Sequence, residues 1–442
     1  TKCATSGCHN DRSKGAAGGL SMESWDKLFE GGNGSASVIP FRHDYSTFFS
    51  YVNTYKDLGV TLVPTMPYNK PALSKEEVLL LRDWINNGAP NKDGEIKFAD
   101  DPKRKKFYVT NQGCDVVTVF DRQTLLPMRY INIGSSSGIE SPHMIRISPD
   151  GDYWYVILLS GNYLEKYRTT DDRFIGKAFI GPGSWNTFVI SSDSKTAYCI
   201  DLNSNGKICT VDLNTLNVVT QKGFAYPHGS ALNSSNDILY VTQQSNSSKI
   251  YKIPVADFSS FSEINLYSTP PPKFLNSHEL RFTPDGSKYF VTCQGTDEVR
   301  VFDASNDALI KIIPVGNAPS ELSFSKTTDH LFVTCMDDTI TFPGKRGSVA
   351  IIDYETNTIE KFIYTGHQPH GIEVDDEKKL VYVINRNATK DGPAPHHSNE
   401  CGGRNGNVSF IDLNTLNMLS SGSSTKKVEI SVDPYSVAIR EQ

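Results

Sequence analysis

The segment Phe107-Tyr108-Val109-Thr110-Asn111 begins a pattern that returns through the rest of the 442-residue chain. An aromatic residue and a valine in a short strand-like run are followed by a Gly, Asn or Ser turn and by a second run that ends in aspartate. Seven copies at a spacing of about forty to fifty residues are typical of a β-propeller with one blade per copy. The later copies are Trp154-Tyr155-Val156, Ala197-Tyr198-Cys199, Leu239-Tyr240-Val241, Tyr289-Phe290-Val291, Leu331-Phe332-Val333 and Val381-Tyr382-Val383.

The ends of the repeat predict how the ring closes. The first copy begins at the second strand of its blade, whereas residues 433–439 near the C-terminus have the pattern of a first strand without a blade. Pairing the two completes one blade and hides both sheet edges. We therefore expect an all-β seven-bladed propeller at residues 106–442, closed by the C-terminal strand. The repeats resemble the YVTN-type seven-bladed propeller family over about residues 103–442, which implies a fold but little about chemistry.

Four of the seven blades carry a histidine at one position of the first strand. The first strand of a blade lines the central channel, so these side chains should ring one mouth of it. The chain has only ten histidines, so four at this one position are far from a random distribution. The aligned residues are His143, His228, His278 and His370, with Asn186, Ser320 and Tyr435 in the other blades.

Two interpretations of this ring stay open. In one, each imidazole has a structural role and hydrogen-bonds a neighbouring carbonyl group. In the other, neutral imidazoles converge on a second metal, with copper as the metal that suits them best, or on an anion or a substrate. Long loops at 336–346 and 386–406 should open on the same face, and the second contains His396 and His397, which would add ligands.

The N-terminal segment Cys3-Ala4-Thr5-Ser6-Gly7-Cys8-His9 places two thiols directly before an imidazole. Two such thiols can bond covalently to the vinyl groups of haem c while the histidine binds the iron. Four residues separate the cysteines here instead of the usual two, so we expect a stretched variant of the attachment. The alternative is that Cys3 and Cys8 form a small disulfide or part of a zinc site.

Three short helices should follow this motif and surround the cofactor. Each has an apolar face and a start or stop signal in the sequence. They are expected after Gly19 and up to Gly31-Gly32, from Tyr45 to Tyr51 with Asp44 as the cap, and from a Ser74/Glu77 capping box to Gly88. The loop before the third helix contains Thr65-Met66-Pro67, where a sixth iron ligand is expected.

Residues 1–92 resemble the cytochrome c domains found in Planctomycetes and Bacteroidetes. The resemblance rests on the two cysteines and histidine, Gly18-Gly19-Leu20, Val38-Ile39-Pro40, Thr65-Met66-Pro67 and the run from Leu81 to Pro90. It implies a small all-α cytochrome with His9 as the proximal ligand and Met66 as the distal one. Met22 and His43 are rivals for the sixth position, and the alternative role for Met66 is a core thioether. The expected domains are the cytochrome at 1–92, a polar linker at 93–105 and the propeller at 106–442.

The six cysteines outside the haem motif are expected to form disulfides. One pair lies across a hairpin, one lies in loops of the first and last blades, and one ends equivalent strands of neighbouring blades, where a disulfide is favoured over copper ligation. These pairs are Cys199 with Cys209, Cys114 with Cys401, and Cys293 with Cys335.

Composition limits the partners and the location. The formal net charge of −6 gives no sign of binding to nucleic acid, and no apolar run approaches the length of a membrane span. Covalent haem attachment to such motifs takes place outside the cytoplasm, and eight cysteines fit an exported protein. We expect a periplasmic, extracellular or cell-surface protein whose secretory or lipoprotein leader is not part of the sequence given.

The first functional hypothesis is an extracytoplasmic c-type cytochrome that carries electrons to or from a redox partner protein. A haem with His/Met ligation has no open position for substrate, so any catalysis would lie at the histidine ring, as a metal-dependent oxidoreductase. The second hypothesis is a cell-envelope binding module with an electron-carrying haem and no catalysis. A propeller with a second haem is a third and weaker one, because the cytochrome-fused nitrite reductases resemble eight blades.

Overall fold

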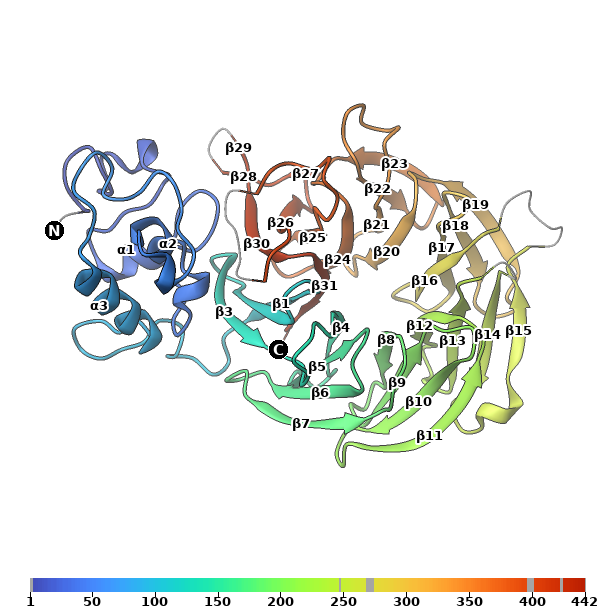
Figure 1. Cartoon of the computed structure of the whole chain (residues 1–442). Coiled ribbons are helices and arrows are strands. Elements are labelled where there is room, and N and C mark those ends of the chain that lie inside the picture. Colours follow the sequence, from blue (N-terminus) through green and yellow to red (C-terminus); the bar gives the residue numbers. More distant parts are fainter. Residues whose placement is uncertain (1–2, 246–247, 268–273, 396–400, 422–423, 442) are drawn as a thin grey trace.

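The computed structural model describes residues 3–245, 248–267, 274–395, 401–421 and 424–441. Figure 1 shows a ring of β-sheets with a smaller, mostly loop-built N-terminal unit at its side. Seven sheets of at least four strands surround the ring axis within these residues, so the seven-bladed propeller is confirmed. No described helix is long and apolar enough to span a membrane.

In each blade the first strand named lies at the channel, and the others follow outward. Blade 1 contains β31 (Pro434–Ile439), β1 (Lys106–Asn111), β2 (Val116–Asp121) and β3 (Leu126–Asn132); blade 2 contains β4 (Pro142–Ile147), β5 (Tyr153–Leu158), β6 (Tyr163–Arg168) and β7 (Phe174–Phe179); blade 3 contains β8 (Trp185–Ile190), β9 (Thr196–Asp201), β10 (Gly206–Asp212) and β11 (Asn217–Phe224). Blade 4 contains β12 (Pro227–Leu232), β13 (Ile238–Gln243), β14 (Lys249–Pro254) and β15 (Ser262–Asn265); blade 5 contains β16 (Ser277–Phe282), β17 (Lys288–Cys293), β18 (Glu298–Asp303) and β19 (Leu309–Pro314).

The last two blades complete the ring. Blade 6 contains β20 (Pro319–Phe324), β21 (His330–Cys335), β22 (Ser348–Asp353) and β23 (Thr358–Ile363); blade 7 contains β24 (Pro369–Asp375), β25 (Leu380–Asn385), β26 (Asn405–Asp412) and β27 (Asn417–Met418), with β30 (Lys427–Val432) also paired to β26 and a small hairpin of β28 (Ser420–Ser421) and β29 (Ser424–Thr425) beside it. The C-terminal β31 pairs antiparallel with β1, with Tyr108 opposite Ala438. The predicted closure is therefore confirmed.

Several second strands contain a valine followed by a buried threonine, and the threonine hydroxyl links two blades. The Thr242 hydroxyl accepts a hydrogen bond from the Gly229 amide in its own blade (2.8 Å) and donates to the carbonyl of His278 in the next blade (2.8 Å). Thr334 makes the same bond to the carbonyl of His370 (2.7 Å). The register shifts at the start of the first strand in these blades, so the hydroxyl supplies a bond that the ladder lacks there. The backbone that carries the channel histidines is thereby tied to the neighbouring blade.

The regular elements of the N-terminal unit are short. They are the α-helices α1 (Trp25–Phe29), α2 (Thr47–Val52) and α3 (Lys75–Asn86), with single 3₁₀ turns at Lys14–Ala16, His43–Tyr45 and Lys56–Leu58. The capping box of Ser74 and Glu77 is present, as predicted. The predicted Asp44 cap is wrong, because Ser46 holds the N-cap position of α2 and the Asp44 carboxylate accepts from Arg42 instead (2.6 Å).

The N-terminal unit packs against blades 1 and 7, beside β3 and β30 (Figure 1). The Tyr45 ring stacks on Tyr130 of β3 with 4.0 Å between centroids, and Arg42 donates to the Tyr130 carbonyl (2.9 Å). The Ser35 hydroxyl donates to the carbonyl of Glu429 in β30 (3.2 Å). One apolar cluster also continues from the helices of this unit into the propeller, where it includes Met128. The two parts therefore share a core.

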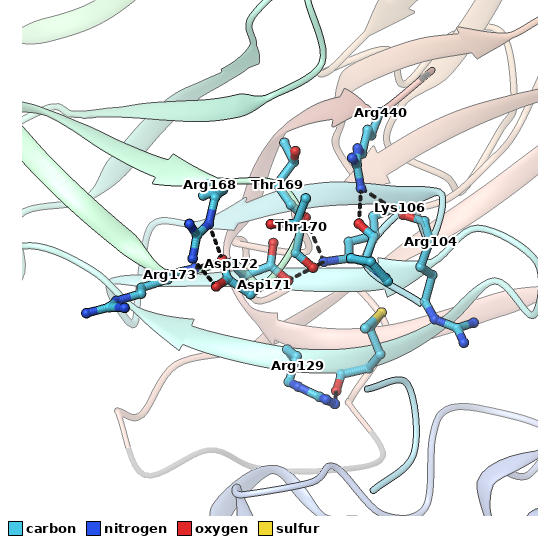
Figure 2. Close-up of polar contacts among 12 residues, drawn as sticks. Arg104, Lys106, Arg129, Arg168, Thr169, Thr170, Asp171, Asp172, Arg173 and Arg440 are labelled. Atoms are coloured by element: carbon cyan, nitrogen blue, oxygen red, sulfur yellow. Dashed lines mark hydrogen bonds and ion pairs between the residues drawn. The ribbon is translucent and has the colours of Figure 1, made fainter. Parts of the chain in front are cut away.

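The segment predicted as a linker lies against the propeller. Phe98 is 9% exposed and belongs to the shared apolar cluster. Arg440 donates to the carbonyls of Pro102 and Arg104, at 3.1 and 3.3 Å. Figure 2 shows Arg440 beside Arg104. The same view shows Lys106 of β1 pointing toward Asp172 of blade 2. The Lys106 Nζ lies 2.7 Å from the Asp172 carboxylate. The contacts of Phe98, Pro102 and Arg104 attach the segment at 93–105 to the propeller.

Candidate functional site

The predicted haem-binding loop brings its three side chains into one compact turn. The His9 amide donates to the Cys3 carbonyl (3.2 Å), and the Cys8 amide donates to the Thr5 carbonyl (3.0 Å). Cys3 and Cys8 are both partly buried, and both lie outside the disulfide that the described residues contain. His9 Nδ1 lies 3.3 Å from the Leu20 carbonyl oxygen. A carbonyl oxygen only accepts, so Nδ1 carries the hydrogen and Nε2 carries the lone pair.

The three residues considered as a sixth ligand have different surroundings. The Met66 amide donates to the Tyr51 carbonyl (2.8 Å), which fixes the loop before α3, and the Met66 side chain is half-buried. The Met22 amide donates to the carbonyl of His9 itself (2.9 Å). His43 Nδ1 is 2.8 Å from the Asn86 side-chain oxygen, and its ring packs edge-on against Phe49.

The channel histidines lie where the alignment places them. Each of the seven aligned residues is the second residue of the innermost strand of its blade, and the four histidines are 2–7% exposed. Five of the seven residues carry aromatic rings that contact one another in an arc around the axis. The centroid distances are 4.2 Å for His143 to Tyr435, 3.7 Å for Tyr435 to His370, 5.7 Å for His370 to His278 and 4.2 Å for His278 to His228. We call these five residues the ring of the channel mouth.

Burial keeps the histidines of this ring neutral. It lowers the pKa of His228 to about 4 and holds the pKa values of His143, His278 and His370 well below the ordinary range. His228 Nδ1 donates to the His278 carbonyl (3.0 Å), which leaves a lone pair on its Nε2. The side-chain amide of Gln112 donates to His143 Nδ1 (2.7 Å), so the Nε2 of His143 carries the hydrogen.

The geometry favours the structural interpretation for part of the ring. His228 uses one nitrogen for a carbonyl group of the next blade, as that interpretation expects. Within the described part of the chain, no three His, Cys, Asp or Glu side chains are grouped so that they could hold a metal ion. His396 and His397, the predicted additional ligands, lie outside the described residues. Copper at this ring stays a prediction.

Charged side chains further down the channel were not singled out from the sequence. Glu279 and Glu321 follow the ring position by one residue in blades 5 and 6, while Arg146, Arg281 and Glu373 follow it by three in blades 2, 5 and 7. Extending the same alignment of first strands by a few residues would have found them. Burial and the neighbouring Glu321 raise the pKa of Glu279 to about 8, whereas Arg281 and Arg146 act in the opposite direction.

One of the three predicted disulfides is present among the described residues. Cys114 and Cys401 are bonded, with 5.5 Å between their Cα atoms, and they join the first and last blades. Cys199 and Cys209 lie directly opposite each other in the ladder, yet both remain thiols, so that predicted disulfide is wrong. Their burial in the core beside blade 2 raises the pKa of both and suppresses the thiolate that oxidation needs. The predicted bond of Cys293 with Cys335 is also absent, since each is a buried thiol whose pKa burial raises.

Comparison with solved structures supports the fold. The chain is similar to a chain described as Kuenenia stuttgartiensis hydrazine synthase, with a TM-score of 0.53 and 15% identity over 70% of this chain and 91% of the other. It is also similar to a functionally unknown protein from Desulfotomaculum acetoxidans DSM 771, with a TM-score of 0.54 and 14% identity over 74% of this chain and 99% of the other. Likeness at this level of identity concerns the fold alone.

A curated relative is similar over part of its length. Antigen Lp49 of Leptospira interrogans serogroup Icterohaemorrhagiae serovar copenhageni, strain Fiocruz L1-130, is 23% identical over 220 residues. The match covers 46% of this chain and 45% of the antigen, so the chain spans less than half of that relative.

The family comparison identifies the propeller. The sequence profile described as "Lactonase, 7-bladed beta-propeller" matches residues 177–400, a little over half of the chain. The seven-bladed fold implied by the YVTN resemblance is confirmed. This chain belongs to the seven-bladed β-propeller family described as lactonase.

Proposed function

We propose that residues 1–92 carry one covalently attached haem c, and that the protein is an extracytoplasmic electron-transfer protein built on a propeller. The observation that supports this best is the contact of His9 Nδ1 with the Leu20 carbonyl (3.3 Å). Iron-binding histidines commonly donate their second nitrogen to such an acceptor, which fixes the ring and keeps the other lone pair available. Cys3 and Cys8 lie in the same turn, as two thioether bonds to one macrocycle require.

Met66 is the proposed distal ligand. A second iron ligand would come from a segment separate from that of His9, whereas the hydrogen bond of the Met22 amide to the His9 carbonyl ties Met22 to the His9 segment. The ring of His43 packs edge-on against Phe49, which restrains it from turning toward the iron. Met66 lies on a separate loop, which the hydrogen bond of its amide to the Tyr51 carbonyl holds in place. Its loop is therefore not tied to the segment of His9.

The apolar side chains of the N-terminal unit also support a bound macrocycle. Among the described residues of this unit, seven apolar residues are buried in the shared core, and nine more that pack against it are only partly covered. Val63, Tyr68 and Leu80 are 85%, 61% and 73% exposed. A flat apolar cofactor would cover surface of this kind. The partly buried members are Leu20, Met22, Trp25, Phe48, Tyr55, Leu58, Leu73, Leu81 and Trp84.

When bound between histidine and methionine, the haem would supply reversible one-electron transfer at a raised potential. The protein's own part is to hold the macrocycle through Cys3 and Cys8, to fix the imidazole of His9 and to cover the apolar face. Absorption spectra of the exported protein, oxidised and reduced, test this function. The proposal expects c-type bands that stay with the polypeptide after acid-acetone extraction, and it fails if no such bands are present.

A second candidate is a cell-envelope binding module in which the haem serves only as an electron carrier. The description of its relative as an antigen favours this candidate, because an antigen of a bacterium is commonly a protein that its host encounters. Membership in the lactonase family establishes the propeller and by itself no reaction. Metal analysis separates the candidates, since stoichiometric copper besides iron supports a catalytic oxidoreductase and iron alone supports the binding module.

A further inference from the structure

A cavity of about 290 Å³ lies where the N-terminal unit meets blades 1 and 7. Its walls come from segments that are far apart in the sequence, so it exists because the two parts of the protein pack together. Small-molecule sites in proteins begin at about 300 Å³, so an occupant of this cavity must be small. The lining includes Lys14 and Gly19, residues 30–35, Thr124 and Leu126 of blade 1, and Lys426 and Val428 of blade 7.

Lys426 brings to this cavity an ammonium group without a carboxylate partner among the described residues. Its Nζ donates to the Thr124 carbonyl of the neighbouring blade (3.2 Å). Burial lowers the pKa of Lys426, and no neighbouring charge in the described part of the chain opposes this effect. An ammonium group has three hydrogens to donate. Lys426 can therefore bind an anion, which would also offset the cost of its burial.

Lys14 is a second cation in the lining. Its Nζ lies 3.9 Å from the carboxylate of Asp11, and that carboxylate forms a closer ion pair with Lys27. The backbone of Lys14 is held in place because its carbonyl accepts from the Gly19 amide (2.7 Å). Lys14 therefore has donors available on the side of the N-terminal unit, while Lys426 has them on the side of the propeller.

The glycine-rich run at 30–35 forms a wall that is held from two sides. The Glu429 amide of β30 donates to the Gly34 carbonyl (3.0 Å), and the Asn33 amide donates to the Gly18 carbonyl (2.8 Å). A Cβ atom added at Gly34 would meet no atom within 4 Å, so the backbone borders open space there. The hydrogen bonds on both sides of this run mean that the wall is formed without a ligand.

The rest of the lining limits the kind of anion. Leu126 and Val428 are 7% and 2% exposed and line the cavity, so they favour an occupant with an apolar part. Glu30 is the one carboxylate among the described lining residues, and its charge opposes an anion. Two cations from the two parts of the protein, together with apolar side chains, suit two acidic groups joined by methylene groups.

We propose that this cavity binds a small aliphatic dicarboxylate, with one carboxylate on Lys426, the other on Lys14, and the methylene groups against Leu126 and Val428. Hydrogen bonds between an ammonium group and a carboxylate are charge-assisted and strong. A bound dicarboxylate would join the N-terminal unit to the propeller. The proposal does not depend on the proposed haem.

Isothermal titration calorimetry of the full chain with succinate, glutarate and adipate tests the proposal. The corresponding neutral diamides are the matched probes without charge, and inorganic phosphate is the compact anion without an apolar part. At least one dicarboxylate should bind about tenfold more tightly than its diamide and than phosphate. Absence of binding by all three dicarboxylates, or equal binding of the diamide or of phosphate, overturns the proposal.

Variants locate the site. Lys426→Gln and Lys14→Gln should each weaken binding of that dicarboxylate about tenfold, whereas Glu30→Gln should strengthen it. Lys195→Gln is the control, because Lys195 lies on the surface of blade 3 beside Asp193. Unchanged affinity in both lysine variants with retained melting temperatures, or weaker binding in the Glu30 variant, contradicts the assignment. If a variant fails to fold, the comparison of ligands on the unmodified chain still decides the outcome.

Discussion

Arg122 and Asp375 form a two-pronged ion pair across the seam of the propeller. Arg122 follows β2 in the first blade, Asp375 ends β24 in the last blade, and both side chains are at most 1% exposed. Tyr382 also donates its hydroxyl to Asp375 (2.6 Å). A buried ion pair therefore joins the first and last blades, in addition to the pairing of β31 with β1 that closes the ring.

Breaking this pair should destabilise the protein strongly. Asp375→Asn removes the buried carboxylate that pairs with Arg122 and leaves only the exposed carboxylate of Glu377 (3.1 Å) beside its guanidinium, so the expected loss of unfolding free energy is about 3–5 kcal/mol. Denaturant titration of both proteins measures the loss. Glu441→Gln is the matched control, because its ion pair with Lys326 is exposed and its removal should cost less than about 1 kcal/mol. Equal losses in the two variants would contradict the importance of the buried pair.

The disulfide of Cys114 with Cys401 should contribute separately. It closes a loop of 287 residues and so restricts the unfolded chain, and its removal typically costs about 2–4 kcal/mol. Cys114→Ser, Cys401→Ser and the double variant should lower the melting temperature by similar amounts. A reducing agent should lower the melting temperature of the unmodified protein and leave that of the double variant unchanged. A further fall in the double variant would show that another disulfide is present.

Glu279 should make stability depend on pH. Its pKa is about 8 in the folded protein and about 4.5 when unfolded, so between these values the folded state binds the extra proton. Stability from this group is present below pH 4.5 and is lost as the pH rises toward 8. Glu279→Gln should flatten the decline in melting temperature between pH 6 and pH 8.5. Since the charge of Glu321 raises the pKa of Glu279 while Arg281 and Arg146 lower it, Glu321→Gln should lower the pKa of Glu279 and reduce the decline.

Several features of the fold could be predicted from the sequence, because their sequence signals are either periodic or local. The seven repeats predicted the blades, the first-strand alignment placed His143 and its equivalents, and Ser74 with Glu77 predicted the start of α3. Each of these signals depends on neighbours in one strand or one turn. The position of the C-terminal strand could also be predicted, because the first repeat of the sequence lacks the innermost strand of its blade.

Other features depend on contacts that no local pattern contains. Asp44 pairs with Arg42 instead of capping α2. Cys199 and Cys209 are opposite in register, as expected, but their burial disfavours oxidation. The mutual pKa effect of Glu279 and Arg146 arises only when the closed ring brings the innermost strands of blades 2 and 5 near one axis.

Met66→Ala tests the proposed distal ligand. Loss of the thioether should leave the haem attached, lower its midpoint potential and allow carbon monoxide to bind the reduced iron. Met22→Ala is the matched control and should leave both properties close to those of the unmodified protein. Redox titration and carbon monoxide difference spectra provide the measurements. Carbon monoxide binding in the Met22 variant alone would reverse the assignment.

The most direct test of the central claim is the intact mass of the exported protein together with its alkaline pyridine spectrum. The proposal predicts a mass increase of one haem per chain, a spectrum of the c type, and loss of both in the Cys3→Ser/Cys8→Ser double variant. His9→Ala should abolish the native spectrum or block maturation. A polypeptide that has the unmodified mass and no colour after export through a functional haem-attachment system would contradict the account.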